Sequence, residues 1–120
     1  MELVIHNRII DTDVEEILER LYVQCEGKFL KRMNRKSDFI SITCPFHKDG
    51  QESHPSCSVY NRHDNPNIVF GTYHCFTCGE QGPLYKLVSK VLNTTYEEAQ
   101  YWLIENFSNI YTDKQIIDAL

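Results

Sequence analysis

The sequence predicts an α+β fold, with a small antiparallel sheet between an N-terminal helix and C-terminal helices. Three observations support this prediction. Apolar residues recur at helical spacing near both ends of the chain, short β-branched or aromatic segments fill the middle, and closely spaced Cys and His residues lie among those segments. The 120 residues fit a single domain, 1–120, whose sheet-containing core is expected at about 27–82.

The helices are predicted from apolar periodicity and from capping residues. The first is expected at about 12–23, where Thr12 and Glu15 form a possible capping box. Two more are expected at about 84–92 and 95–107, and Thr95 with Glu98 would cap the second of them. The apolar positions of the first helix are Val14, Ile17, Leu18 and Leu21.

Between these helices the sequence changes to short segments separated by turn residues. The segments "KFLKRM", "DFISIT", "SCSVY" and "NIVFGTY" are rich in β-branched or aromatic residues. Turn-forming stretches such as "NRK", "KDGQ" and "RHDNPN" separate them. We therefore expect four strands, at about 28–33, 38–43, 56–60 and 67–73, joined into one antiparallel sheet.

Charge is distributed unevenly along the chain. The net charge is −5. Residues 26–63 hold seven basic and four acidic residues, whereas the segments on either side each carry a net charge of −4. The middle segment could therefore touch phosphates, although the whole protein should not coat nucleic acid indiscriminately. The opening "MELVIHNRII" lacks a signal-peptide pattern, so we expect a soluble intracellular protein without membrane contact.

Six possible metal ligands occur in three pairs, each with two residues between its members. The pairs are Cys44 with His47, His54 with Cys57, and Cys75 with Cys78. Disulfides are rare inside cells, so such spacings indicate metal or redox chemistry. A structural zinc site closes with four Cys or His ligands, and two of the three pairs would supply them.

Local sequence favours the first and last pairs. Cys75 and Cys78 are followed by Gly79, which suits the positive φ often needed after a metal-binding knuckle. Cys44 and His47 directly follow a predicted strand, where a second knuckle would lie. His54 and Cys57 have no following glycine, and Cys57 fits a small buried apolar residue. We expect one structural Zn²⁺, held in a zinc ribbon by Cys44, His47, Cys75 and Cys78.

These motifs resemble a known family. "CPFHKDGQESHPS" followed by "YHCFTCGEQG" resembles the zinc-binding domain, a CHC2-type zinc finger, of DnaG-type DNA primases, especially bacteriophage versions. The resemblance covers about residues 12–107 and implies the same four ligands. The matching residues are Cys44, Pro45, His47, Pro55, Ser56, Tyr73, His74, Cys75, Phe76, Cys78, Gly79 and Gly82.

Two positions depart from the family pattern. Cys57 stands where the family usually has an aromatic residue, which puts a packing or base contact there in doubt. Pro83 follows Gly82 where the family often has Asp, so the cap of the next helix differs.

The resemblance implies a domain that recognises single-stranded DNA template and holds template and starting nucleotides for primer synthesis. The implied partner is a TOPRIM polymerase domain in the same or a separate chain, with a replicative helicase as a further candidate. The compartment would be the cytoplasm of a bacterium or of a phage-infected host. We expect no catalysis from this chain alone, because Asp11-Thr12-Asp13 is better explained as the acidic start of a helix than as part of a Mg²⁺ site.

The nucleic-acid contacts are expected in the sheet and its loops, where basic and aromatic residues mix. We rank Phe76 below Tyr60 and Tyr73 because its ring could instead pack over the zinc. We expect His74 to make a backbone or sulfur contact, with a nucleic-acid contact as the less favoured alternative. The alternative is a zinc ribbon that docks on a replication or transcription protein without reading DNA. The candidate contact residues are Lys28, Lys31, Arg32, Arg35, Lys36, Lys48, Tyr60, Arg62, Tyr73 and Phe76.

Overall fold

The computed structural model describes residues 2–5, 8–27, 29–30, 33–35, 38–46, 54–62 and 64–107. Its elements, in order, are β1 (Glu2–Ile5), β2 (Arg8–Asp11), α1 (Val14–Gln24), β3 (Met33–Arg35), β4 (Phe39–Ile42), β5 (Cys57–Tyr60), β6 (Tyr73–Cys75), β7 (Gln81–Gly82), α2 (Leu84–Leu92) and α3 (Tyr96–Phe107). Within these residues, no helix is both long and apolar enough to cross a bilayer.

The central element is a five-stranded sheet in the order β3-β4-β5-β6-β7, with every pair antiparallel. Burial alternates along β4, β5 and β6, so one face of the sheet is buried and the other meets solvent. The buried face includes Ile40, Ile42, Val59 and Tyr73. The expected antiparallel zinc-ribbon sheet, flanked along the chain by an N-terminal helix and C-terminal helices, is therefore confirmed.

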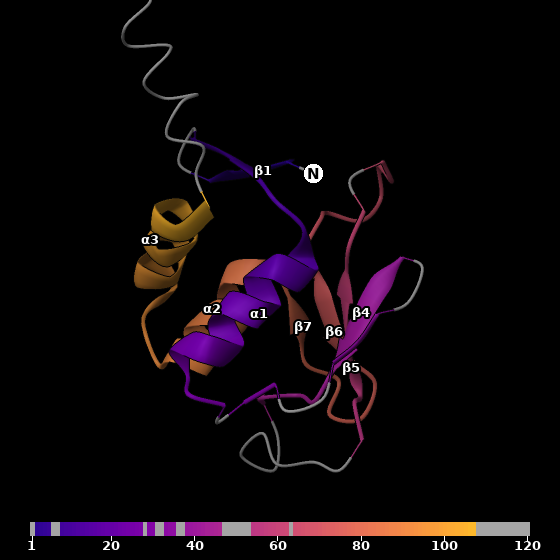
Figure 1. The fold of residues 1–120 in the computed structure, drawn as a ribbon. Coiled ribbons are helices and arrows are strands. Elements are labelled where there is room, and N and C mark those ends of the chain that lie inside the picture. The colour runs from indigo at the N-terminus through magenta and orange to yellow at the C-terminus, as the bar shows by residue number, and fades with distance from the viewer. Residues whose placement is uncertain are drawn as a thin grey trace, which may run out of the picture.

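The helices lie on one side of this sheet (Figure 1). In α1 the residues Val14, Ile17, Leu18 and Leu21 are fully buried, as their helical spacing predicts. Buried residues of α2 belong to the same core, and α3 packs mainly against α2. The Val14 N–H donates to the Asn61 side chain at 3.1 Å, which ties the start of α1 to the end of β5.

The helix starts test the two predicted caps. The Glu98 N–H donates to the Thr95 hydroxyl at 3.1 Å, which confirms the cap expected before α3. The cap expected at Thr12 is wrong by one residue, because Asp13 is the N-cap and accepts from the Glu15 N–H at 2.7 Å. A carboxylate is an equally good cap and adds a favourable charge at the helix N-terminus.

Two strands lie further along the chain than expected, each sharing one residue with its predicted segment, and one hairpin was missed. Positions 34 and 35, expected in a turn, belong to β3. In 28–33 the backbone at Leu30 is left-handed, with φ 59°, so this segment is not one continuous strand and β3 begins at Met33. The segment 67–73 is mostly turn, and β6 begins at Tyr73. The missed hairpin is β1–β2, which the β-branched residues on either side of positions 6 and 7 could have indicated.

Candidate metal centre

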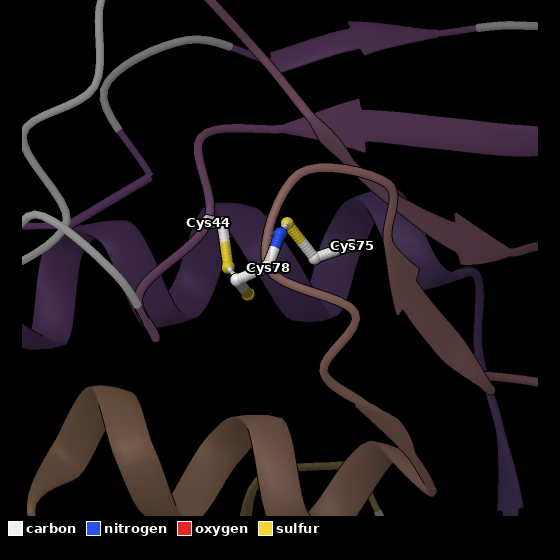
Figure 2. A group of neighbouring side chains, drawn as sticks. All are labelled: Cys44, Cys75 and Cys78. Atoms are coloured by element: carbon white, nitrogen blue, oxygen red, sulfur yellow. Dashed lines mark hydrogen bonds between the residues drawn. The ribbon is translucent and has the colours of Figure 1, made fainter.

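Three cysteine side chains converge from two separate segments of the chain (Figure 2). Cys44 follows β4, whereas Cys75 ends β6 and Cys78 lies in the turn after it. Their Sγ atoms all lie within 4.8 Å of one another, and those of Cys44 and Cys78 are 3.8 Å apart. Cys44 and Cys75 are buried, while Cys78 is exposed, so the cluster lies at the edge of the core.

Backbone N–H groups in two turns point at the sulfur atoms. Phe46 N–H donates to Cys44 Sγ at 3.4 Å, and Cys78 N–H donates to Cys75 Sγ at 3.5 Å. The second turn closes with a Gly79 N–H to Cys75 carbonyl bond of 3.0 Å, and Gly79 has φ +77°. The positive φ predicted at this glycine is thus confirmed, and both turns stabilise negative charge on sulfur.

The three thiols differ in acidity. Burial raises the pKa of Cys75, but hydrogen bonds from the Cys78 N–H and the Ser56 hydroxyl outweigh it and lower that pKa to about 6. Burial raises the pKa of Cys78 to about 11, aided by its hydrogen bonds with Cys75 and Cys44. A hydrogen bond with Cys57, followed by burial, raises the pKa of Cys44. Cys75 is therefore the thiol most readily present as the thiolate that a metal requires.

The arrangement fits a tetrahedral thiolate metal. With metal–sulfur bonds of about 2.3 Å, the sulfurs of a tetrahedral zinc site lie about 3.8 Å apart. The Cys44–Cys78 separation of 3.8 Å matches that spacing. Three of the four residues expected as ligands are therefore together, and the fourth, His47, lies outside the described residues.

The residues of the rejected pair behave differently from each other. His54 is exposed. Cys57 is fully buried, lies opposite Cys75 in the β5–β6 register, and contacts Cys44. Cys57 is not a member of the group whose Sγ atoms lie mutually within 4.8 Å. It therefore packs beside the cluster as a buried thiol.

Comparison with known families identifies the family of the chain that carries this cluster. The CHC2 zinc finger family matches residues 7–118, which is most of the chain. The chain belongs to the CHC2 zinc finger family. The resemblance to the zinc-binding domain of DnaG-type primases is thereby confirmed, and the cysteine cluster agrees with zinc binding.

The relatives of this CHC2 zinc finger are much longer proteins. It is 31% identical over 93 residues to a protein named DNA primase from Mycolicibacterium smegmatis, covering 77% of this chain but 13% of the relative. The DNA primase of Mycobacterium leprae is 29% identical over 103 residues, which cover 85% of this chain and 14% of that relative. The DNA primase of Campylobacter jejuni is 28% identical over 110 residues, which cover 89% of this chain and 16% of that relative. The chain therefore spans about one seventh of the length of these relatives.

The solvent side of the zinc finger's sheet carries polar and aromatic residues. Register places Asn34, Ser41, Ser58, His74 and Gln81 in one row across the five strands. Phe39 and Tyr60 pair directly to one side of this row, two residues from Ser41 and Ser58, and Phe76 lies to the opposite side, past the end of β6. We call the surface formed by Phe39, Ser41, Ser58, Tyr60, His74 and Phe76 the outer face.

The expected ranking of aromatic residues is corrected. Tyr73 is fully buried and stacks on Phe46, so its ring is not available to a base. Phe76 is 73% exposed, and its ring centroid lies 4.6 Å from that of His74. The role expected for His74 is also wrong, because alternation with buried Tyr73 and Cys75 turns its side chain to solvent. That alternation groups Tyr73 with Cys75 and His74 with Phe76 in the sequence, but packing decides which group is buried.

Of the basic residues expected at nucleic acid, two lie in the described part of the chain. Arg35 forms ion pairs with Glu15 and Asp13 of the α1 start, and it lies on the helix side of the sheet. Arg62 forms ion pairs with Asp38, at 3.0 Å, and with Asp64. Both charges are already matched by acids. Lys28, Lys31, Arg32, Lys36 and Lys48 lie outside the described residues.

Proposed function

We propose that this chain is the zinc-binding, template-recognition domain of a DNA primase, and that it supports RNA primer initiation by a TOPRIM polymerase domain. The observation that carries the proposal is the cysteine cluster of a CHC2 zinc finger supporting a sheet whose outer face is exposed. Cys44, His47, Cys75 and Cys78 would hold one Zn²⁺. When bound, the ion supplies a cross-link between two turns of a small fold, and a closed four-ligand site leaves no position for catalysis.

The outer face supplies what a single-stranded template needs. Phe76 and His74 form an exposed aromatic pair at the metal end of the sheet, and Phe39 and Tyr60 form a second pair at the other end. Bases stack on such rings with little sequence preference, at roughly 1–3 kcal/mol each. The hydroxyls of Ser41 and Ser58 lie between the two pairs and would contact base edges or the backbone.

The distribution of charge indicates which surfaces single-stranded DNA would avoid. The first turns of α1 and α3 hold Glu15, Glu16, Glu97 and Glu98. These acids repel phosphates and would confine single-stranded DNA to the sheet. Because Arg35 and Arg62 are matched by acids, phosphate contacts would come from Lys28, Lys31, Arg32, Lys36 and Lys48. The affinity of the isolated domain for single-stranded DNA should therefore be weak and salt-dependent.

The test is binding of short fluorescent single strands, measured by anisotropy at several salt concentrations. Phe76→Ala should weaken binding, since it removes an exposed ring without disturbing the core. Val69→Ala is the matched control, because Val69 is 68% exposed in the turn before β6 and lies outside the aromatic pairs. Equal binding by the parent and Phe76→Ala, or no binding at low salt, would contradict template recognition by this face.

One observation favours a docking module as the second candidate. Ile68 and Val69 are exposed apolar residues in one turn, 39% and 68% accessible, and such side chains suit contact with another protein. A docking module would bind a replication or transcription protein and no single strand. The anisotropy experiment separates the two, and loss of protein binding in Val69→Asp would identify the docking surface.

A further inference from the structure

A fourth thiol lies beside the three cysteines of the metal centre. Cys57 begins β5, the strand between β4, which leads to Cys44, and β6, which ends at Cys75. In the β5–β6 ladder, the Phe76 N–H donates to the Ser56 carbonyl at 2.9 Å. Pairs with and without backbone hydrogen bonds alternate along an antiparallel ladder, so the adjoining pair, Cys57 with Cys75, is one without them, in which side chains lie closest. The Cys57 thiol therefore lies against the cysteine cluster.

Cys57 contacts one expected metal ligand without belonging to the cluster. A hydrogen bond joins its thiol to that of Cys44. The group whose Sγ atoms lie mutually within 4.8 Å does not include Cys57. Both Cys44 and Cys57 are fully buried, so neither is open to a reagent in solvent. In the zinc-loaded domain, Cys57 would thus be an uncoordinated thiol in contact with a coordinated one.

Solvent reaches the cluster at Cys78. Of the five cysteines, all of which lie in the described part of the chain, Cys78 alone is exposed. Its Sγ lies 3.8 Å from that of Cys44 (Figure 2). A metal-bound cysteine is a thiolate, and an accessible thiolate is the form that peroxides oxidise. A peroxide would therefore react first at Cys78, with the Cys44 sulfur within reach of the product.

We propose that Cys57 is a resolving thiol, which moves oxidation from the exposed Cys78 into the core and ends it as a buried Cys44–Cys57 disulfide. The inference rests on the zinc-binding part of the proposed function, because Cys44 and Cys78 are taken as ligands. The reactant is a hydroperoxide, and the reaction removes Cys44 from the ligand set.

The steps balance in atoms and electrons with hydrogen peroxide as the oxidant. The Cys78 thiolate attacks one peroxide oxygen, the O–O bond breaks, hydroxide leaves, and Cys78 becomes a sulfenic acid. The Cys44 thiolate attacks the Cys78 sulfur, which forms a Cys44–Cys78 disulfide and releases a second hydroxide. One hydroxide takes the Cys57 proton, and the resulting thiolate attacks the Cys44 sulfur, so that Cys78 leaves again as a thiolate. One peroxide is reduced, and Cys44 and Cys57 are oxidised to a disulfide.

The last step replaces an exposed disulfide with a buried one. The Cys44–Cys78 bond would contain the exposed Cys78, whereas Cys44 and Cys57 are both fully buried. A disulfide is reduced when a thiolate attacks one of its sulfurs, so access to those sulfurs limits the rate. The Cys44–Cys57 bond should therefore keep Cys44 from the metal after the peroxide has been consumed.

Disulfide mapping of the zinc-loaded chain tests this assignment. Equimolar hydrogen peroxide is added, thiols are blocked with N-ethylmaleimide, and linked peptides are identified by mass spectrometry, while a chromophoric chelator measures zinc released relative to untreated protein. The parent should release zinc and contain Cys44 joined to Cys57. Cys57→Ala should stop at Cys44–Cys78. The matched control is Cys25→Ala, which removes the thiol at the C-cap of α1 and should give the same map as the parent.

The map of the parent decides the outcome by itself, even where Cys57→Ala fails to fold. A parent in which Cys57 is blocked by maleimide would overturn the inference. A parent in which Cys57 is joined to Cys75, or in which Cys44 stays joined to Cys78, would overturn it as well.

The rate of recovery tests whether the disulfide is shielded. After reduced glutathione and zinc are added, the oxidised parent should regain zinc at least roughly fivefold more slowly than oxidised Cys57→Ala, because its disulfide is buried. Equal recovery rates would contradict a shielded disulfide.

Failure of this inference can be distinguished from failure of the proposed function. The zinc content of the parent is measured before oxidation, and a parent without zinc would overturn both. A zinc-loaded parent whose Cys57 stays unlinked would overturn this inference alone. A parent that forms the Cys44–Cys57 bond but binds no single strand would remove template recognition and keep this site.

Discussion

Phe46 and Tyr73 stack face to face, with ring centroids 5.2 Å apart and planes 10° from parallel. Phe46 belongs to the first metal-binding turn, where its N–H donates to Cys44 Sγ. Tyr73 is fully buried on β6, and its hydroxyl donates to Glu80 at 3.3 Å. The stack therefore joins one turn of the metal centre to the core below the other turn.

Loss of this stack should destabilise the fold. Phe46→Ala should lower the free energy of unfolding of zinc-loaded protein by about 2 kcal/mol, because it removes a half-buried ring and its aromatic partner contact. Urea unfolding followed by circular dichroism measures this change. Phe76→Ala is the matched control, since that ring is 73% exposed, and it should cost less than about 0.5 kcal/mol. Similar losses in the two variants would contradict a structural role for the stack.

Removal of a metal ligand should unfold the ribbon. Cys44→Ser, His47→Ala, Cys75→Ser and Cys78→Ser should each lose zinc and cooperative unfolding, because metal binding and folding are coupled in small zinc domains. Elemental analysis should give one zinc per parent chain. Chelation of the parent should produce the same unfolded spectrum, and a value of two zincs would show that the four residues do not account for the metal.

The residues of the rejected pair should be dispensable for the metal. His54→Ala should change neither zinc content nor stability, since His54 is exposed. Cys57→Ala should keep the zinc and cost about 1 kcal/mol, because a small group is removed from a fully buried site. Loss of zinc from Cys57→Ala would identify Cys57, which contacts Cys44, as a ligand in place of His47.

Two glycines should respond differently to alanine. Gly79 has φ +77° and open space around an added Cβ, so Gly79→Ala should cost about 1 kcal/mol for backbone conformation alone. Gly71 has φ +87°, and an added Cβ would lie 2.9 Å from Leu84 Cβ at the start of α2. Gly71→Ala should therefore cost about 3 kcal/mol by adding overpacking. Thermal unfolding of both variants checks the order, and equal losses would refute the contact with α2.

Primer synthesis should need a second domain. In the described part of the chain, the group that could hold a metal ion is made of cysteines, not of the carboxylates that Mg²⁺ prefers. The pure chain should make no primers, whereas adding it to a matching polymerase domain should raise initiation at particular template sites. Gel analysis of radiolabelled products measures both. Primers made by the chain alone would contradict the assignment. The four variants that each lack one expected metal ligand control for carry-over of polymerase.

Local sequence determined much of this molecule. Helical spacing of apolar residues was sufficient to predict α1, α2 and α3, because the buried face of an amphipathic helix follows from the positions of its own apolar residues. The Gly79 conformation and the Thr95 cap were equally predictable, because each depends on a few adjacent residues. The spacing of Cys75 and Cys78 likewise predicted the turn that brings their thiols together.

Tertiary structure alone decided which aromatic residues face solvent and which charges are free. Tyr73 and Phe76 look alike in sequence, yet register against β5 buries the first and leaves the second exposed, because sheet faces depend on pairing between distant segments. Arg35 and Arg62 are matched by Glu15 and Asp38, which lie 20 and 24 residues away. A cavity of about 520 Å³ between the end of α1 and the end of α2 also forms only once these two helices are packed together, because neither segment encloses it alone.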